Sequence, residues 1–167
     1  MIYLVTGVID SGKTQKMRSL YRESGKGDGF ISPKSFERST FVGYDIMRLS
    51  SQKRKPLAYL LDFIPPHWDE AYRYGRFSFS RSALLFAEEI ISDILLNRID
   101  PVYIDETGPL ELEGKGFYEI LQVLLQTERT IYISIRSSLI EEIVQTFGLE
   151  KYKVIYRKDR RDDRPLC

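Results

Sequence analysis

The sequence has very little cysteine: its single cysteine is Cys167, the last of 167 residues. One cysteine cannot form a disulfide within the chain, and a zinc site built on the usual cysteine pairs is likewise excluded. Long apolar runs are also missing, since no stretch approaches the roughly 18 residues needed to cross a bilayer. No secretory signal pattern is present either. These absences predict a cytoplasmic protein without membrane contacts.

The sequence also lacks an excess of charge of either sign. Its 25 Lys and Arg residues balance 24 Asp and Glu residues, for a formal net charge of +1. No strong field therefore draws the chain to nucleic acid or anionic lipid, so nucleic acid stays open as a partner but is not indicated. An apolar content of 43% is ordinary for one globular domain with a real core. We expect a monomer.

The most informative stretch is GVIDSGKT, residues 7–14, which lies between the apolar run 2–5 and a predicted helix over 13–23. Its pattern of glycine, four residues, glycine, lysine and threonine is typical of a phosphate-binding loop, provided that a strand precedes it and a helix follows. Glycines let backbone amides point at phosphate oxygens, and the helix N-terminus adds a positive dipole end. We expect Lys13 to reach the β- and γ-phosphates and the Thr14 hydroxyl to ligate Mg²⁺. The alternative is an ordinary glycine-rich turn before a helix. The predicted nucleotide-binding residues are Gly7, Val8, Ile9, Asp10, Ser11, Gly12, Lys13, Thr14 and Gln15.

A second acidic element follows the short apolar run 102–104, where the sequence reads VYIDE. A magnesium ion beside a phosphate loop needs a carboxylate at the C-terminal end of a neighbouring strand. We expect Asp105 to hold Mg²⁺, while Glu106 points to the other side of the strand end and polarises an attacking water as a catalytic residue. The alternative is an acidic boundary between a strand and a surface loop.

Two arginines are candidates for stabilising negative charge in the transition state. Arg136 follows the apolar run 131–135, so it lies at a strand end that can face the γ-phosphate. Arg76 begins the strand before the long helix and could reach the site through the β-rich insertion that precedes this helix. A surface salt bridge is the alternative for both, and Arg136 is the preferred catalytic candidate.

Alternating strands and helices predict an α/β fold with a mostly parallel sheet and helices on both faces. The clearest helix covers 81–96, and further helices are expected at 116–126 and from Ser138 to 147, the last with a capping box between Ser138 and Glu141. Further strands are expected at 130–135 and 152–156. We expect residues 1–156 to form one domain and 157–167 a charged C-terminal tail.

Residues 29–79 read as a β-rich insertion within that domain. Strands are expected at 29–32, 39–49, 57–63 and 76–79, with a basic turn at 50–56. The intervening stretch, 65–75, reads as an aromatic-rich loop. Its Trp68 or Tyr72 could close over a nucleotide base, and surface packing is the alternative.

With GVIDSGKT, IDETGPLEL (residues 104–112) and Phe117 in place, the sequence resembles the small P-loop nucleoside-triphosphatases first described from thermophiles, which have relatives in animals. The order and spacing match over about residues 1–156. The resemblance implies a three-layer, RecA-like P-loop NTPase fold and slow, Mg²⁺-dependent hydrolysis of several nucleoside triphosphates. The resemblance implies that six functional residues of the family are matched in this sequence, and it gives Glu111 a role in orienting a loop. The six are Gly7, Gly12, Lys13, Thr14, Asp105 and Glu106.

The sequence departs from this family at two positions of the expected site. Asp10 replaces a usual glycine and puts a carboxylate beside the phosphates, which could weaken their binding. Arg136 stands where relatives often have proline.

The sequence thus predicts a Mg²⁺-dependent enzyme that hydrolyses a nucleoside triphosphate such as ATP or GTP. No Asn-Lys-x-Asp string fixes guanine, so broad base specificity is expected. One rival is a nucleotide or nucleoside kinase, with its acceptor site in the aromatic and basic insertion. Another is a nucleotide-dependent binding switch with negligible turnover.

Overall fold

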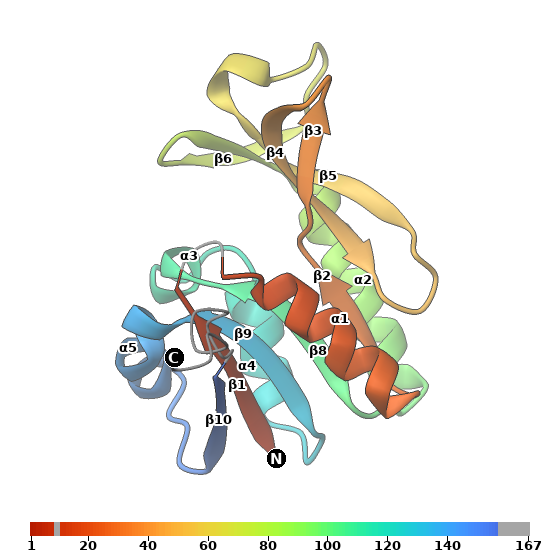
Figure 1. Cartoon of the computed structure of the whole chain (residues 1–167), viewed down its shortest axis with the longest axis vertical. Helices are drawn as coiled ribbons and strands as arrows, with labels where there is room; N and C mark the ends of the chain where they lie inside the picture. The colour runs from red at the N-terminus through yellow and green to blue at the C-terminus, as the bar shows by residue number, and fades with distance from the viewer. Residues whose placement is uncertain (9–10, 157–167) are drawn as a thin grey trace, which may run out of the picture.

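The apolar runs of the sequence form the strands of one sheet in the computed structural model, which describes residues 1–8 and 11–156 (Figure 1). The predicted tail, 157–167, and two predicted loop residues, Ile9 and Asp10, lie outside the described residues. The strands are β1 (Ile2–Gly7), β2 (Asp28–Ile31), β3 (Lys34–Glu37), β4 (Thr40–Arg48), β5 (Arg54–Leu60), β6 (Glu70–Tyr74), β7 (Phe77–Ser80), β8 (Val102–Thr107), β9 (Ile131–Arg136) and β10 (Tyr152–Tyr156). The helices are α1 (Lys13–Ser24), α2 (Arg81–Leu96), α3 (Pro109–Leu112), α4 (Tyr118–Leu125) and α5 (Ile140–Thr146), with 3-10 turns at Leu61–Phe63 and Ser137–Leu139.

The sheet has a parallel half and an antiparallel half. Its order is β10-β1-β9-β8-β2-β4-β5-β7-β6, with β3 beside β4. Strands β10, β1, β9, β8 and β2 pair in parallel, whereas every pairing from β2–β4 onward is antiparallel. The expected parallel sheet is therefore present, but the insertion strands extend it, so the sheet as a whole is mixed. Because β2 pairs with β8, the antiparallel half begins after residues 29–32 rather than with them.

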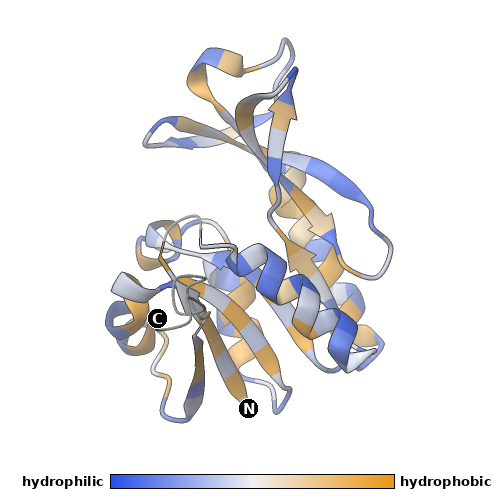
Figure 2. Ribbon diagram, viewed as in Figure 1, coloured by the Kyte–Doolittle hydropathy of each residue, from blue (hydrophilic) through white to orange (hydrophobic). Residues whose placement is uncertain are grey.

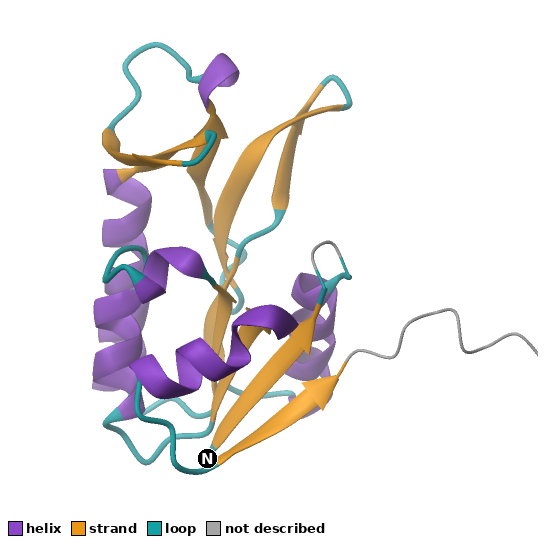
Figure 3. Cartoon of the chain, turned by 90° about the vertical axis from the view of Figure 1, so that its left-hand side faces the viewer, coloured by secondary structure: helices purple, strands orange, loops and turns teal. Residues whose placement is uncertain are grey.

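Helices cover both faces of the parallel half, which gives the expected three layers (Figure 3). On one face, α1 buries Met17 against alternate residues of the strands, among them Val5 and Tyr103. On the other face, α2, α4 and α5 pack against the remaining alternate residues, including Leu4 and Ile104. A strand that is buried on both faces is typically rich in apolar residues. In Figure 2, β1 and β9 are largely hydrophobic with paler bands between, while α1 is mostly hydrophilic on its outer side.

Helix α2 is the longest of the described helices and begins and ends where the sequence predicts. Its N-cap is Ser80, one of the two expected capping residues, whose hydroxyl accepts a hydrogen bond from Ala83 N at 3.2 Å. Among residues 1–8 and 11–156, no helix is both long and apolar enough to cross a membrane.

Several predicted elements differ from the structure. The stretch 65–75 is not all loop, because 70–74 form β6, and the strand β3 was not predicted. The basic turn is shorter than 50–56, since β5 begins at Arg54, and 61–63 form a 3-10 turn instead of strand. The predicted capping box at Ser138 is wrong: α5 begins at Ile140 after a 3-10 turn and has no side-chain cap. Because the 3-10 turn occupies Ser137–Leu139, Ser138 does not lie at the N-cap position that its spacing from Glu141 suggested.

Candidate active site

The phosphate-loop motif lies between β1 and α1, as its pattern requires. Gly12 ends the loop with φ 82° and ψ 34°, a left-handed conformation that favours glycine. Gly7 is needed for space, since a Cβ there would lie 2.3 Å from the Ser11 hydroxyl oxygen. Ser11 N donates to the carbonyl of Val8 at 3.2 Å, which tightens the turn. The described part of the loop therefore depends on both glycines of the motif.

Lys13 points back across this loop. Its side chain is buried, and Nζ donates to the carbonyl oxygen of Val8 at 3.1 Å. Lys13, Thr14 and Gln15 line one cavity. The Val8 side chain is exposed, and Val8 takes part through its backbone carbonyl, which accepts the hydrogen bond from Lys13. The ammonium group is thus held where an anion bound in the loop would meet it.

The centre of the site is Asp105, which is 1% exposed. Its carboxylate accepts hydrogen bonds from the Thr14 hydroxyl at 2.7 Å, from Ser32 N at 3.1 Å and from the Ser134 hydroxyl. Ser32 also donates its hydroxyl to the backbone carbonyl of Asp105, at 2.7 Å. These partners come from α1, the end of β2 and β9, all of which meet at the C-terminal end of β8. The structure thus brings together the two predicted metal ligands, Thr14 and Asp105, although they are 91 positions apart.

The donor set at this point fits a magnesium ion. Mg²⁺ takes oxygen ligands and is usually bound through one or two carboxylates together with substrate phosphates. Thr14 Oγ1 and Asp105 Oδ2 supply such oxygens on the wall of the cavity that Lys13 also lines. Among the described residues, no three His, Cys, Asp or Glu side chains gather to form a metal cage of their own. A metal held here would therefore depend on the oxygens of a bound phosphate.

Glu106 lies beside Asp105 but faces a different partner. Strand β8 continues through both residues, so they are not beyond the strand end as predicted. The Glu106 carboxylate lies 3.5 Å from Arg136 Nε, and both side chains are about one-third exposed, at 35%. Burial and the negative charge of Asp105 raise the pKa of Glu106, while Lys13 and Arg136 act in the opposite direction.

Arg136 is the last residue of β9, and the strand register pairs it with Gly7 of the phosphate loop. Since β9 lies between β1 and β8, Arg136 has the loop on one side and the acidic strand on the other. The structure therefore brings Arg136 to the expected site. The second candidate, Arg76, lines an adjoining cavity from the antiparallel half, which Arg136 lines as well.

Two cavities meet at Glu106. The first, of about 350 Å³, contains the phosphate-loop residues and is bordered on its far side by the insertion residues Lys34, Phe36 and Tyr44. The second, of about 310 Å³ and called here the aromatic cavity for its six aromatic lining residues, lies between the antiparallel half and the segment 108–117. Glu106, Ser32 and Tyr44 line both. The insertion therefore forms one wall of each cavity.

Glu111 holds the segment between the acidic strand and α4. It is 3% exposed, and its carboxylate accepts from Gly108 N at 2.7 Å and from Phe117 N at 2.9 Å. Burial raises the pKa of Glu111 to about 7 against the lowering effect of these backbone donors. The helix between them, α3, was not predicted, although Pro109 at its first position is a known start signal.

Sequence reasoning missed Ser32 and Ser134 as partners of Asp105. A buried serine inside the apolar strand IYISIR was the available signal for Ser134, whereas Ser32 follows an ordinary strand. Of the two residues that could close over a base, Tyr72 lines the aromatic cavity. Trp68 instead donates from Nε1 to the Ser78 hydroxyl at 2.8 Å and packs edge-on against Tyr59, so it lines neither cavity.

Comparisons with known proteins agree with one another. The family model described as NTPase matches residues 2–164. The nucleoside-triphosphatase THEP1 of Pyrobaculum aerophilum is 30% identical over 152 residues, which cover 87% of this chain and 79% of that protein. The protein of the same name from Archaeoglobus fulgidus is 28% identical over 149 residues, 86% of this chain and 84% of that one.

Two solved structures share the fold. The crystal structure of THEP1 from the hyperthermophile Aquifex aeolicus superposes with a TM-score of 0.74 at 19% identity, covering 98% of this chain and 93% of that one. The solution structure of a human cancer-related nucleoside triphosphatase gives a TM-score of 0.67 at 24% identity, covering 95% and 89%. The architecture expected from the sequence is therefore found in both.

Proposed function

This chain belongs to the NTPase family and hydrolyses nucleoside triphosphates, and from that premise we propose how its residues divide the work. Lys13 and the loop amides bind the phosphates, Thr14 and Asp105 hold Mg²⁺, and Glu106 activates the attacking water. The observation that carries this proposal is the 2.7 Å hydrogen bond between Thr14 and Asp105 on the wall of the cavity that Lys13 and Glu106 also line.

The proposed reaction is the attack of water on the γ-phosphorus, with the nucleoside diphosphate as leaving group. In phosphoryl transfer the protein mainly positions the reactants and stabilises charge. Mg²⁺, when bound, neutralises part of the phosphate charge. Lys13 releases the Val8 carbonyl and donates to phosphate oxygens, while Glu106 accepts a hydrogen bond or a proton from the water. Asp105 is kept in one orientation by Ser134 and Ser32.

Arg136 is proposed to stabilise the charge that develops at the γ-phosphate. Its position beside Gly7 supports this role, and a guanidinium group can contact two phosphate oxygens at once. In the free protein Arg136 Nε lies 3.5 Å from Glu106 Oε1, so the two side chains hold each other's charge until a phosphate draws the guanidinium group away. We propose that this ion pair contributes to slow turnover.

We propose that the enzyme hydrolyses nucleoside triphosphates with different bases, including both ATP and GTP. No Asn-Lys-x-Asp string is present to select guanine, and the groups placed at the phosphate cavity address phosphates rather than a base. We further propose that the enzyme acts as a monomer in the cytoplasm, where nucleoside triphosphates are available.

The test is phosphate release from ATP, GTP, CTP and UTP with Mg²⁺, for the wild type and Glu106→Gln. The variant keeps the shape of the side chain but cannot accept a proton. We expect hydrolysis to fall by about 10²–10⁴-fold for every nucleotide. Binding of a non-hydrolysable ATP analogue should change by less than a few-fold.

Glu113→Gln is the matched control, because Glu113 is a partly exposed carboxylate paired with Lys115. It should hydrolyse all four nucleotides like the wild type. Equal phosphate release by wild type and Glu106→Gln would contradict the role of Glu106, and failure of EDTA to stop the reaction would contradict the metal site.

A further inference from the structure

The aromatic cavity is a second space beside the phosphate site, and the proposed hydrolysis assigns it no ligand. It encloses about 310 Å³, close to the lower end of the volumes that small-molecule sites have. Strands β4, β6 and β7 supply most of its rings, and the start of α4 closes it from the other side. The aromatic residues on its walls are Tyr44, Tyr72, Tyr74, Phe77, Phe79 and Phe117.

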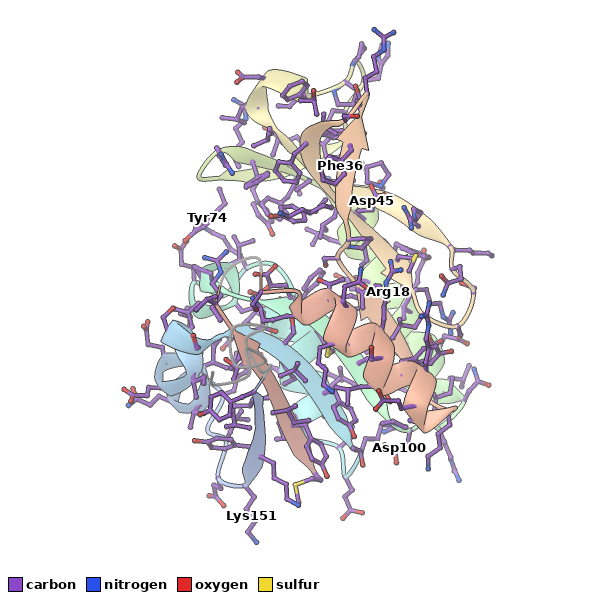
Figure 4. The ribbon with its side chains drawn as sticks, viewed as in Figure 1. Arg18, Phe36, Asp45, Tyr74, Asp100 and Lys151 are labelled. Carbon is purple, nitrogen blue, oxygen red and sulfur yellow. The ribbon has the colours of Figure 1, made fainter. Side chains whose placement is uncertain are left out.

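The walls are held in place by ring contacts and a backbone hydrogen bond. Tyr72 and Phe79 stack with their ring centres 5.3 Å apart, and the Tyr72 hydroxyl accepts a hydrogen bond from Gly116 N at 3.1 Å. Figure 4 shows Tyr74 reaching from β6 toward the segment that contains α3. There its hydroxyl meets Glu113, whose charge adds to burial in raising the pKa of Tyr74. The cavity thus joins the two halves of the molecule.

The cavity opens at the reacting end of the phosphate site. A phosphate-loop lysine contacts the β- and γ-phosphates, and Lys13 and Glu106 line the same cavity. Glu106 also lines the aromatic cavity, so that cavity adjoins the γ-phosphate. The nucleoside part of the bound triphosphate is attached through its sugar to the α-phosphate, at the opposite end of the triphosphate from the γ-phosphate. A ligand in the aromatic cavity would therefore be a second molecule.

The chemistry of the walls selects the kind of molecule. Aromatic side chains stack on any planar ring, and base stacking on them contributes about 1–3 kcal/mol per base. Where the aromatic cavity meets the phosphate cavity, the Glu106 carboxylate can accept a hydrogen bond from a hydroxyl group, and Arg136 lies beside it. A nucleoside offers a planar base for the rings and sugar hydroxyls for the carboxylate.

We propose that the aromatic cavity binds a nucleoside and that the enzyme transfers the γ-phosphoryl group to one of its hydroxyls. This inference rests on the proposed binding of the triphosphate at Lys13, Thr14 and Asp105. The acceptor oxygen forms a bond to the γ-phosphorus as the bond from that phosphorus to the β–γ bridging oxygen breaks. The hydroxyl proton passes to Glu106 and then to solvent. The products are a nucleoside diphosphate and a nucleoside monophosphate, and water replaces the acceptor when the cavity holds none.

The test incubates the full chain with Mg²⁺, γ-labelled ATP and each of adenosine, guanosine, cytidine and uridine. Labelled nucleoside monophosphate and labelled phosphate are measured in the same sample. We expect at least one nucleoside to yield monophosphate. In Tyr74→Ala the ratio of monophosphate to phosphate should fall about tenfold, because the variant removes one aromatic wall. Tyr152→Ala is the matched control, since Tyr152 lies on the edge strand β10 and is 38% exposed; its ratio should equal that of the wild type.

The failures are distinguishable. Phosphate release without monophosphate from any of the four nucleosides would overturn the acceptor site and leave the hydrolase intact. Equal ratios in Tyr74→Ala and Tyr152→Ala would also overturn it, because the cavity would then have no part in the transfer. If Lys13→Ala leaves both products unchanged, the proposed triphosphate site itself is wrong. Saturation-transfer NMR with the same nucleosides and a non-hydrolysable ATP analogue checks binding: signals lost in Tyr74→Ala support the site, and signals that persist unchanged contradict it.

Discussion

The parallel and antiparallel halves of the sheet place different kinds of side chain around the two cavities that meet at Glu106. At the C-terminal ends of the parallel strands lie Lys13, Asp105, Glu106 and Arg136, which bear charge. The antiparallel half contributes mainly rings, from β4, β6 and β7. In open α/β sheets, ligands bind at the carboxyl ends of the parallel strands. In the division of roles proposed above, the parallel half carries the phosphate chemistry and the half that extends it carries recognition.

The two halves share one hydrophobic core, because Ile46 of β4 and Leu57 of β5 belong to the same buried cluster as Leu4 and Ile104. Beyond this core they are joined at a few specific points. Strand β2 belongs to both, and the Tyr72–Gly116 hydrogen bond joins β6 to the segment before α4. Glu111 holds that same segment to the acidic strand through Gly108 N and Phe117 N. Substitutions of exposed or cavity-lining side chains in one half should leave the other half's property intact, whereas substitutions in the shared core or at these junctions should affect both.

Lys13→Ala should give the largest effect. The variant removes the cation that faces the β- and γ-phosphates, and the loss of one preorganised electrostatic group typically lowers turnover by about 10²–10³-fold. Phosphate release from Mg-ATP measures the loss. Lys53→Ala, in the exposed turn between β4 and β5, is the matched control and should retain wild-type activity. Similar losses in both variants would mean that general charge, not the phosphate loop, governs turnover.

Glu111→Gln should remove a pH dependence of folding stability. The folded state raises the pKa of Glu111 from 4.5 to about 7, so it binds a proton more readily than the unfolded chain. The free energy of unfolding should therefore fall as pH rises from about 4.5 to about 7, by up to about 3 kcal/mol, and stay level above that. Urea unfolding at pH 5 and pH 8 should show this fall for the wild type and a smaller one for the variant.

The control for this experiment is Glu113→Gln, two positions further along the chain. Hydrogen bonding to Lys115 lowers the pKa of Glu113, so this group stays ionised between pH 5 and pH 8. Its variant should keep the wild-type pH dependence. If Glu111→Gln keeps it as well, Glu111 is ionised in the folded protein throughout this range.

Ser134→Ala tests the support of Asp105 from β9. Removing a side chain that hydrogen-bonds to a metal ligand commonly costs 10–100-fold in metal affinity or activity, and we expect about tenfold in Mg-ATP hydrolysis. A magnesium titration should show weaker apparent affinity. Ser138→Ala is the control: the sequence assigns Ser138 a helix cap, but the structure leaves it exposed without one. A larger effect at Ser138 than at Ser134 would favour the sequence-based assignment.

Tyr72→Phe should give the smallest effect. It removes only the hydrogen bond from Gly116 N, which contributes about 1 kcal/mol of stability. Urea unfolding measures this loss, with Tyr152→Phe as a control that should not change the unfolding midpoint. A loss well above 2 kcal/mol in Tyr72→Phe would show that the two halves depend on each other more than their separate roles imply.

Much of the parallel half could be predicted from the sequence because its signals are local. The phosphate loop combines fixed glycine, lysine and threonine positions with an apolar strand before it and a helix after it, and α1 follows as expected. Helix α2 was predicted with its bounds because its apolar residues recur at helical spacing and Ser80 caps it. Strand β10 likewise matches its predicted range.

The antiparallel half was harder because short strands rich in rings have no clear alternation of apolar and polar residues. Strand β6 lies in a stretch with prolines, an aspartate and four aromatic or imidazole side chains, which reads as a loop. It becomes a strand because β7 offers a partner for its backbone. The predicted cap at Ser138 failed for the related reason that spacing alone does not place a helix end.

The sequence by itself determined that this chain contains a phosphate loop and an acidic strand. Their order and spacing also determined its resemblance to a family of nucleoside triphosphatases. Only the tertiary structure decided which groups surround Asp105, because Thr14, Ser32 and Ser134 reach it from three elements that no local pattern connects. It also decided that Glu106 stands between two cavities rather than at one surface. The physical reason is that residue periodicity sets local conformation, whereas the order of strands in the sheet sets which strand ends are neighbours.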